Sequence, residues 1–249
     1  MKSEEYVKKG KETAVLCIHG ILGTPEHFDF LLEHIPQSWH VCCVLLDGHG
    51  KTADDFARSS MKKWEKQIEE KLDELSKEYE NIIIVGHSMG TLLAAECAAK
   101  GYDKIRALFL LNVPLVISIK PRAMKNSMTV IFELPVKDGD DLGKASKAAY
   151  NIIPDRRLWK YLKWIPRYLE LFSKARSTKR CLDKIKVPCV VFMSKKDELV
   201  SMRSCKCIKK HTHIELNVLE NSAHYFYSES DTKAMTDRFE KLCEELELI

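Results

Sequence analysis

The most constraining feature of the sequence is the pentapeptide G-x-S-x-G at residues 86–90, because of the segments that flank it. Ile82–Val85, directly after Asn81, is apolar and β-branched, which predicts a strand, and Thr91–Ala99 is rich in leucine and alanine, which predicts a helix. A strand that enters a helix through so tight a turn holds Ser88 in a strained conformation and needs glycine on both sides. We interpret the turn as one that exposes the Ser88 hydroxyl at the carboxyl end of a sheet, as a candidate nucleophile. An ordinary glycine-rich turn is the alternative.

Short apolar runs alternate with longer amphipathic segments along the rest of the chain. The runs that predict strands are Ala14–Ile18, Val41–Leu46, Ile82–Val85, Ala107–Leu111, Cys189–Met193 and Ile214–Leu219. The segments that predict helices are Pro25–His34, Met61–Tyr79, Ser88–Lys100 and Asp231–Leu246. Continuously apolar strands fit a parallel sheet that is covered on both faces. The order of elements therefore predicts an α/β fold with a mostly parallel, doubly wound sheet.

One segment interrupts this alternation. Residues 113–180 contain no convincing strand, but they hold five prolines and the polar turn Lys137–Asp141. This pattern indicates several short helices inserted between two core strands. We therefore expect a core formed by residues 1–112 and 181–249, with residues 113–180 as a small helical cap.

A serine hydroxyl needs a general base, and the position of His224 fits that role. It lies in the polar turn after the predicted strand Ile214–Leu219, and loops at the carboxyl ends of parallel strands carry the sites of such sheets. His211 and His213 stand at the start of that strand, where we expect surface residues. We predict that His224 is the base for Ser88.

The base in turn needs a carboxylate that orients its ring, and Asp197 is the predicted partner. It follows the strand Cys189–Met193 after a three-residue link, so it should emerge at the same sheet edge as His224. Glu198 is the nearest competitor. A solvated loop carboxylate is the alternative interpretation of Asp197.

The oxyanion of an acyl-transfer intermediate needs two backbone N–H donors. Met89, directly after the candidate nucleophile, would supply one of them. The loop H-G-I-L-G at residues 19–23 would supply the other from Ile21, because its glycines let the chain fold close to Ser88. A plain strand-to-helix turn is the alternative for this loop.

These motifs resemble the α/β-hydrolase superfamily and, within it, compact microbial carboxylesterases and monoacylglycerol lipases. The motifs are H-G-I-L-G at 19–23, G-H-G at 48–50, G-H-S-M-G at 86–90, D-E-L-V at 197–200 and A-H at 223–224. The resemblance covers nearly the whole chain, and it implies an α/β-hydrolase fold with a small cap. It also implies fewer than eight strands, because little chain precedes Thr13 to form the N-terminal hairpin of larger members. No metal and no organic cofactor are implied.

Some positions separate this chain from parts of the superfamily. Ser194 and Asn221 stand where glycine is frequent, so we expect slightly different turns there. Ser88 stands where haloalkane dehalogenases and epoxide hydrolases carry aspartate, and the loop at 19–23 lacks the doubled-glycine-proline motif of prolyl iminopeptidases. These relatives are therefore excluded.

Apolar neighbours of the catalytic positions indicate where an acyl group would bind. Near the serine these neighbours are Ile21, Leu22, Met89 and Tyr225. In the inserted segment the candidate wall residues are Leu115, Met128, Ile131 and Trp159. Core packing is the alternative role for each of the residues in the insertion.

The sequence thus predicts a serine hydrolase that cleaves carboxylic esters of small or medium acyl chains through an acyl-enzyme intermediate. Its partner would be a small-molecule ester. Two alternatives stay open: a thioesterase or other acyl hydrolase with the same triad, and a non-catalytic binding protein on a hydrolase scaffold. The acyl-chain length, the alcohol group and the oligomeric state cannot be derived from the sequence.

Composition limits the partners and the compartment. There are 40 Lys and Arg residues against 36 Asp and Glu residues, and no aromatic-basic motif accompanies this small excess, so we do not expect nucleic acid as a partner. Nine cysteines cannot all pair within one chain, and many of them lie in apolar runs, which favours small buried residues in a reducing cytoplasm. A metal or redox site is the alternative. No run approaches the ~20 apolar residues of a membrane span, so we expect no integral membrane segment and a cytoplasmic protein.

A set of basic residues in the insertion permits one further expectation. Arg156, Lys160, Lys163 and Arg167 are spaced to share one face of a helix, which Pro166 should kink or break. A solvated helix face is one interpretation. The other is attraction to an anionic substrate or lipid surface, which would allow weak surface association.

Overall fold

Seven strands form one sheet in the computed structural model, which describes residues 6–9 and 13–246. The strands are β1 Tyr6–Lys8, β2 Thr13–Ile18, β3 His40–Val44, β4 Asn81–His87, β5 Ile105–Leu111, β6 Cys189–Ser194 and β7 Ile214–Leu219. Their order is β1-β3-β2-β4-β5-β6-β7, and all neighbours are parallel except the antiparallel pair β1 and β3. The predicted sheet, mostly parallel and with fewer than eight strands, is confirmed for the described residues.

All six predicted strands are present, whereas β1 was not predicted. Its three residues are too few to show a hydrophobic pattern, and Tyr6 and Val7 are both exposed at the sheet edge. Pairing with β3, and not an apolar face of its own, makes this segment a strand.

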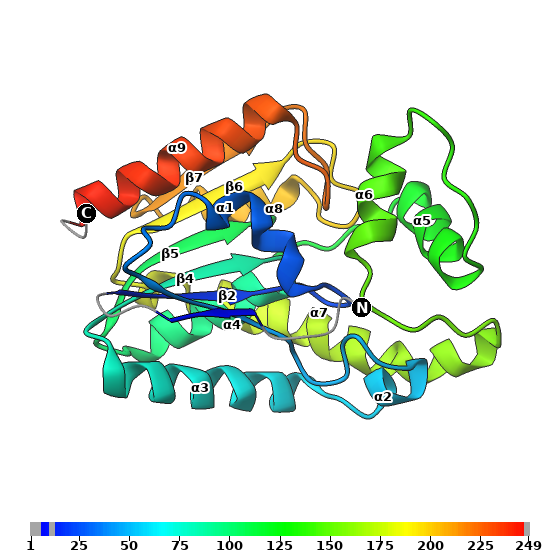
Figure 1. Cartoon of the computed structure of the whole chain (residues 1–249), viewed down its shortest axis with the longest axis horizontal. Coiled ribbons are helices and arrows are strands. Elements are labelled where there is room, and N and C mark those ends of the chain that lie inside the picture. Colours follow the sequence, from blue (N-terminus) through cyan, green and yellow to red (C-terminus); the bar gives the residue numbers. More distant parts are fainter. Residues whose placement is uncertain (1–5, 10–12, 247–249) are drawn as a thin grey trace.

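Helices cover both faces of the sheet (Figure 1). Those with α-helical geometry are α1 Asp29–Leu32, α2 Ala53–Ala57, α3 Met61–Glu78, α4 Met89–Lys100, α5 Pro121–Ile131, α6 Asp141–Ala149, α7 Ile165–Lys179, α8 Arg203–Ile208 and α9 Glu229–Glu245. Short 3₁₀ helices are η1 Pro25–Phe28, η2 Leu158–Trp164 and η3 Leu182–Lys184. Within the described residues, no helix is both long enough and apolar enough to cross a membrane.

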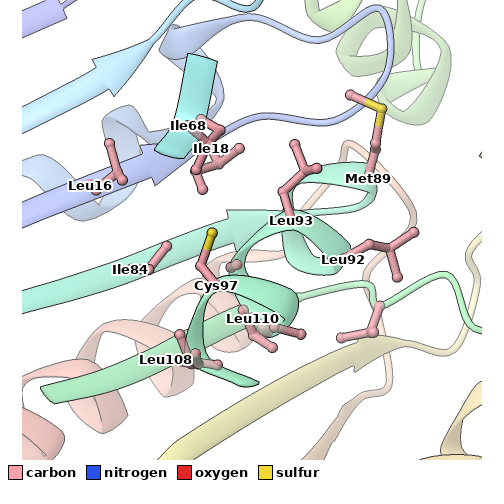
Figure 2. Packing of buried hydrophobic residues seen from close by; sticks show 14 of the residues in the cluster. Leu16, Ile18, Ile68, Ile84, Met89, Leu92, Leu93, Cys97, Leu108 and Leu110 are labelled. Carbon is pink, nitrogen blue, oxygen red and sulfur yellow. The ribbon is translucent and has the colours of Figure 1, made fainter. Parts of the chain in front are cut away.

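The central strands are apolar on both sides because each side is covered. In β2, Leu16 and Ile18 belong to the core that includes α3 and α4, whereas Val15 and Cys17 belong to the core that includes α9. Figure 2 shows Leu16 and Ile18 on the side of α4 and of Ile68 from α3. Burying a side chain of this size stabilises the fold by about 1.5–3 kcal/mol. The two-sided burial explains why the runs are continuous and do not alternate.

Helix α4 lies very close to β2 at Gly90. A Cβ added to this residue would lie 1.9 Å from the carbonyl oxygen of Ile18, so no larger residue fits. The close approach fixes the N-terminus of α4, with Ser88 directly before it, beside the carboxyl end of β2. This contact sets where the nucleophile elbow stands relative to the loop that follows β2.

The inserted segment, residues 113–180, consists of two parts that pack differently. Helices α5 and α6 stand beyond the ends of the strands, whereas α7 lies along the core helices (Figure 1). Lys174 of α7 is buried and bonds Glu65 of α3, at 2.6 Å from Nζ to Oε1, and Glu96 of α4. The indole N–H of Trp164 donates to the carbonyl of Ala53 at 2.8 Å. That residues 113–180 form a cap distinct from the core stays a prediction.

The prediction that these basic residues share one helix face is wrong. Lys160 and Lys163 lie in the 3₁₀ helix η2 and Arg167 lies in α7, so the residues do not share one helix. Pro166 occupies the first turn of α7, where a missing N–H costs nothing, and it therefore begins that helix. Both lysines form ion pairs with Asp54, at 2.6 and 2.9 Å, so much of this charge is neutralised within the fold.

Candidate active site

Ser88 stands at the turn between β4 and α4 with a backbone conformation that is rare for a residue with a side chain. Its φ is 49° and its ψ is −121°, a conformation that costs about 1–3 kcal/mol. Its N–H donates to the carbonyl of Leu111 at 2.9 Å, and its carbonyl accepts from Thr91 N–H at 2.9 Å. A Cβ on Gly20 would lie 2.9 Å from the Ser88 Cβ, so the loop after β2 closes directly over the serine. This is the geometry expected of a nucleophile elbow.

His224 and Asp197 form a buried pair. The Nδ1 atom of His224 lies 2.7 Å from Oδ2 of Asp197, and each side chain is 1% exposed. The other carboxylate oxygen accepts the N–H groups of Leu199 and Val200, both at 2.7 Å. The carboxylate is therefore fixed by its own loop, with one oxygen reserved for the imidazole.

The electrostatic surroundings of His224 act in opposite directions on its pKa. Burial lowers it, while the negative charge of Asp197, the hydrogen bond to that carboxylate and the charge of Glu198 all raise it. The net effect is a pKa above the ordinary value for histidine. Protonation of the ring during a reaction is thus favoured by the two neighbouring carboxylates.

Glu198, the competitor for the role of orienting acid, contacts a different part of the same histidine. Its Oε2 atom accepts the backbone N–H of His224 at 3.2 Å, and its side chain is buried. Two adjacent loop carboxylates therefore hold His224 from two sides, and Asp197 is the one that contacts the ring.

Two further side chains, neither singled out in the sequence, place the loop of His224 next to Ser88. His87 Nε2 bonds the carbonyl of His224 at 3.0 Å. Asn112 Nδ2 donates to the same carbonyl at 3.3 Å, while its Oδ1 accepts the N–H of Ser194 at 2.8 Å. Asn112 also has a positive φ of 55°. An asparagine directly after a buried strand, where a left-handed residue can stand, is the signal that could have pointed to it.

The predicted oxyanion donors lie on the two segments that meet at Ser88. Met89 is the first residue of α4, and Ile21 follows Gly20 in the loop after β2. Across residues 6–9 and 13–246, neither backbone N–H has a hydrogen-bond acceptor in the protein. The loop is held by His19, whose Nδ1 bonds the Gly20 carbonyl at 2.7 Å and whose Nε2 accepts from Leu46 N–H.

Two neighbouring apolar cavities open beside this constellation and share part of their walls. The first, of about 310 Å³, is lined by Ile21, Leu22, Ile119, Ala123, Met124, Ser127, Met128, Tyr150, Tyr168, Leu199 and Tyr225. The second, of about 160 Å³, is lined by Leu22, Ser127, Val130, Ile131, Tyr150, Ile152, Tyr161, Trp164 and Tyr168. Both lie between the loop after β2 and the inserted helices.

The structure places the predicted wall residues unequally. Leu22, Met128 and Tyr225 line the first cavity, and Leu22 and Ile131 line the second. Leu115 is a buried core residue and lines neither cavity, so its expected role is corrected. Its position only four residues after β5 leaves it packed against the core of the sheet. Trp159 also lines neither cavity and is 64% exposed.

Comparisons with known proteins agree with this architecture. The family model described as Hydrolase_4, serine aminopeptidase S33, matches residues 10–231. The thermostable monoacylglycerol lipase of Bacillus sp. (strain H-257) is 27% identical over 95% of this chain and 92% of its own length. Monoacylglycerol lipase ABHD6 of Rattus norvegicus is 23% identical over 91% of this chain and 74% of its own length.

Solved structures agree at the level of the fold. A structure from work on the metagenome-derived lipolytic enzymes LipS and LipT has a TM-score of 0.76 and 21% identity, and the match covers 98% of both chains. The thioesterase domain from the curacin biosynthetic pathway has a TM-score of 0.64 and 20% identity, over 94% of this chain and 92% of that one. Because the family model spans most of the sequence, the protein is a hydrolase with the α/β-hydrolase fold and belongs to the Hydrolase_4 family, serine aminopeptidase S33.

Proposed function

We propose that the protein is a serine hydrolase that cleaves carboxylic esters of small or medium acyl chains. Ser88 would be the nucleophile, His224 the general base and Asp197 the group that orients the base. One observation carries the proposal: His224 Nδ1 makes a buried 2.7 Å contact with Asp197 Oδ2, and the backbone of the same histidine is hydrogen-bonded to His87, the residue before the strained Ser88. The carboxylate at Nδ1 fixes the tautomer in which Nε2 is free to accept a proton.

The chemistry proceeds in two halves. In acylation, Nε2 of His224 accepts the hydroxyl proton as Oγ of Ser88 attacks the ester carbonyl carbon. The tetrahedral intermediate then collapses, and the alcohol oxygen leaves with the proton from the imidazolium. In deacylation, water gives a proton to His224 and attacks the acyl carbon, which releases the acid and restores the Ser88 hydroxyl.

The N–H groups of Ile21 and Met89 would bind the oxyanion in both halves. Both belong to segments whose backbone is fixed, Met89 by the seating of α4 on β2 and Ile21 by the bonds that His19 makes. Donors held in place before the reaction need no reorganisation as charge develops, which is the usual source of a large rate effect.

The two apolar cavities support an acyl group as the part of the substrate that binds beside Ser88. Their shared wall contains Leu22, which neighbours the proposed oxyanion donor Ile21, and Tyr168 from the inserted segment. An acyl chain that enters past Ile21 would bury its methylene groups there, at about 0.8 kcal/mol for each. Monoacylglycerols are substrates to test first, because two of the relatives bear the name monoacylglycerol lipase.

The decisive experiment is covalent labelling with a fluorophosphonate probe. Wild-type protein should be labelled, and Ser88→Ala should not. Labelling that persists in Ser88→Ala, or an unlabelled wild type, would refute the proposal. A panel of p-nitrophenyl esters of increasing chain length, monoglycerides and an acyl thioester then identifies the acyl group and distinguishes an esterase from a thioesterase.

Weak association with a lipid surface is a separate part of the proposal. Several apolar side chains of the insertion are more than half exposed, among them Met124, Trp159, Leu162 and Leu169. Side chains of this kind bind the interface of a bilayer. Co-sedimentation with phosphatidylcholine vesicles tests the idea: Trp159→Ala should lower the bound fraction, and a wild type that stays in the supernatant would contradict it.

The cytoplasmic location also stays a proposal. It is supported by cysteines that serve as small apolar core residues. Burial raises the pKa of Cys189 to about 12, and burial together with nearby acidic groups raises that of Cys243 to about 12. Cell fractionation tests the location directly.

A further inference from the structure

Glu198 is a buried carboxylate whose two oxygens face different parts of the molecule. Oε2 accepts the backbone N–H of His224 at 3.2 Å, and Oε1 accepts the hydroxyl of Ser146 at 3.3 Å. Ser146 belongs to α6, and its own oxygen accepts from Nδ2 of Asn126 in α5 at 2.9 Å. The side chains of Glu198, Ser146 and Asn126 are all nearly inaccessible to solvent. A continuous chain of buried hydrogen bonds thus runs from α5 through α6 to the loop of His224.

We propose that Glu198 is a positioning residue that couples the α5–α6 part of the insertion to His224. Its carboxylate holds the histidine backbone with one oxygen and the α6 hydroxyl with the other. Seating of α5 and α6 on the core therefore completes the support of the general base. Departure of α6 would leave a buried carboxylate oxygen without its donor, which is unfavourable. The inference rests on the proposed function of Ser88 and His224.

Three other contacts, made by two residues, show that the same part of the insertion reaches the site elsewhere. The N–H of Lys120, directly before α5, donates to the Glu198 carbonyl at 2.9 Å. The Nζ atom of Lys120 donates to the Asp197 carbonyl at 2.5 Å. The N–H of Asn151, just after α6, donates to the carbonyl of Leu22 at 2.7 Å. Both ends of the α5–α6 segment are thereby attached to loops of the candidate active site, and Ser146 provides the contact in between.

The first test removes the α6 end of the chain. Ser146→Ala should lower kcat for p-nitrophenyl acetate by about threefold or more with little change in KM, because a short acyl group does not need the cap for binding. The matched control is Thr129→Val, which deletes an exposed hydroxyl of α5 that bonds the Lys125 carbonyl within its own helix. A Ser146→Ala enzyme with wild-type kcat on acetate, and a raised KM on long esters alone, would show that α6 only binds the acyl chain.

The second test changes the charge and keeps the shape. The groups that face His224 are His27 from η1, His87 from β4, Tyr225 from its own loop, and Asp197 and Glu198 from the loop after β6. Glu198→Gln retains an acceptor for the histidine N–H but removes one of the two negative charges. The acid limb of the kcat/KM profile should therefore move to lower pH, with kcat at high pH within about threefold of wild type.

Glu198→Ala removes the acceptor as well, and its kcat at high pH should fall by about tenfold. If Glu198→Gln keeps the kcat that Glu198→Ala loses, the loss comes from the missing hydrogen-bond acceptor and not from the missing charge. Glu220→Gln is the matched control, since it removes an exposed carboxylate that pairs with Lys195. A Glu198→Ala enzyme with wild-type kcat at high pH contradicts the positioning role, and a pH profile of Glu198→Gln that coincides with wild type contradicts the effect of the Glu198 charge on His224.

Fluorophosphonate labelling of the wild type distinguishes the two levels of failure. If the wild type is not labelled, the proposed function fails and the role of Glu198 fails with it. If the wild type is labelled while Ser146→Ala and Glu198→Gln both behave as wild type, only the coupling is refuted. Circular dichroism of each variant identifies any that does not fold, and the pH profile of Glu198→Gln stays available if Glu198→Ala is lost.

Discussion

The side-chain amide of Asn112 donates to the carbonyl of His224, with 3.3 Å between Nδ2 and the oxygen. Oδ1 of the same amide accepts the N–H of Ser194, the last residue of β6. Asn112, which directly follows β5, therefore connects β6 to the loop after β7. Asn112→Ala should lower kcat by about tenfold and the free energy of unfolding by about 1–3 kcal/mol, since buried partners lose their bonds. Kinetics on a short ester and urea denaturation measure the two effects. Asn81→Ala, at a less buried site, is the control and should change neither by as much.

The strained backbone of Ser88 predicts that two inactive variants differ in stability. Alanine at this position keeps a Cβ and therefore keeps the strain of a positive φ, whereas glycine relieves it. The free energy of unfolding of Ser88→Gly should exceed that of Ser88→Ala by about 1–2 kcal/mol, so the glycine variant should unfold at a higher urea concentration. If the alanine variant is equally stable or more stable, the backbone at Ser88 is not strained.

The contact at Nδ1 predicts different outcomes for the two neighbouring carboxylates. Asp197→Asn presents an amide to His224 and favours the wrong tautomer, so kcat should fall by up to ~10⁴-fold while the fold is retained. Glu198→Gln should keep most of its activity at high pH. Near wild-type turnover by Asp197→Asn, together with an inactive Glu198→Gln, would reverse the assignment of the orienting acid.

Buried His19 predicts how stability depends on pH. Burial lowers its pKa to about 4 in the folded protein, while the bond to the Gly20 carbonyl acts against this shift. The unfolded chain binds a proton below about pH 6.5, so stability is complete above that pH and is lost as the pH falls towards 4. This residue alone accounts for about 3 kcal/mol of that loss. Urea denaturation at several pH values should show a shallower dependence for His19→Gln than for the wild type, and an unchanged dependence in this variant would refute the role of His19.

The two cavities predict that the insertion determines acyl-chain preference. Met128 lines the first cavity and Ile131 the second, so tryptophan at either position should shift preference towards shorter chains with less effect on acetate esters. Leu134→Trp is the control, because this exposed residue of the same segment lines neither cavity. Equal effects on all chain lengths would disprove the role of these cavities.

The sheet could be predicted because its central strands are buried on both sides, which leaves unbroken apolar runs in the sequence. The position of Ser88, Asp197 and His224 at one edge of the sheet could be predicted because each follows a strand, and the carboxyl ends of parallel strands meet at one edge. The choice between Asp197 and Glu198 depended on the directions of two adjacent loop side chains. Hydrophobic periodicity in the sequence carries no information about these directions.

Other features depend on contacts between distant segments. Asn112 acts through a left-handed backbone and bonds to residues far away in sequence, so composition carries little sign of it. The basic residues around Pro166 show a helical spacing, but a 3₁₀ helix ends and an α-helix begins between them. Leu115 is apolar, as a cavity wall requires, but its position in the fold makes it a core residue.

The order of the strands has a consequence for how activity is acquired during folding. The proposed machinery comes from the ends of β2, β4, β6 and β7, and β7 is both the last strand within residues 13–246 and an outer strand of the sheet. No segment of the chain that stops short of β7 contains all of these groups. Turnover of a chromogenic ester is therefore a reporter of complete assembly. During refolding it should return only after β7 has joined, later than the helical signal in circular dichroism.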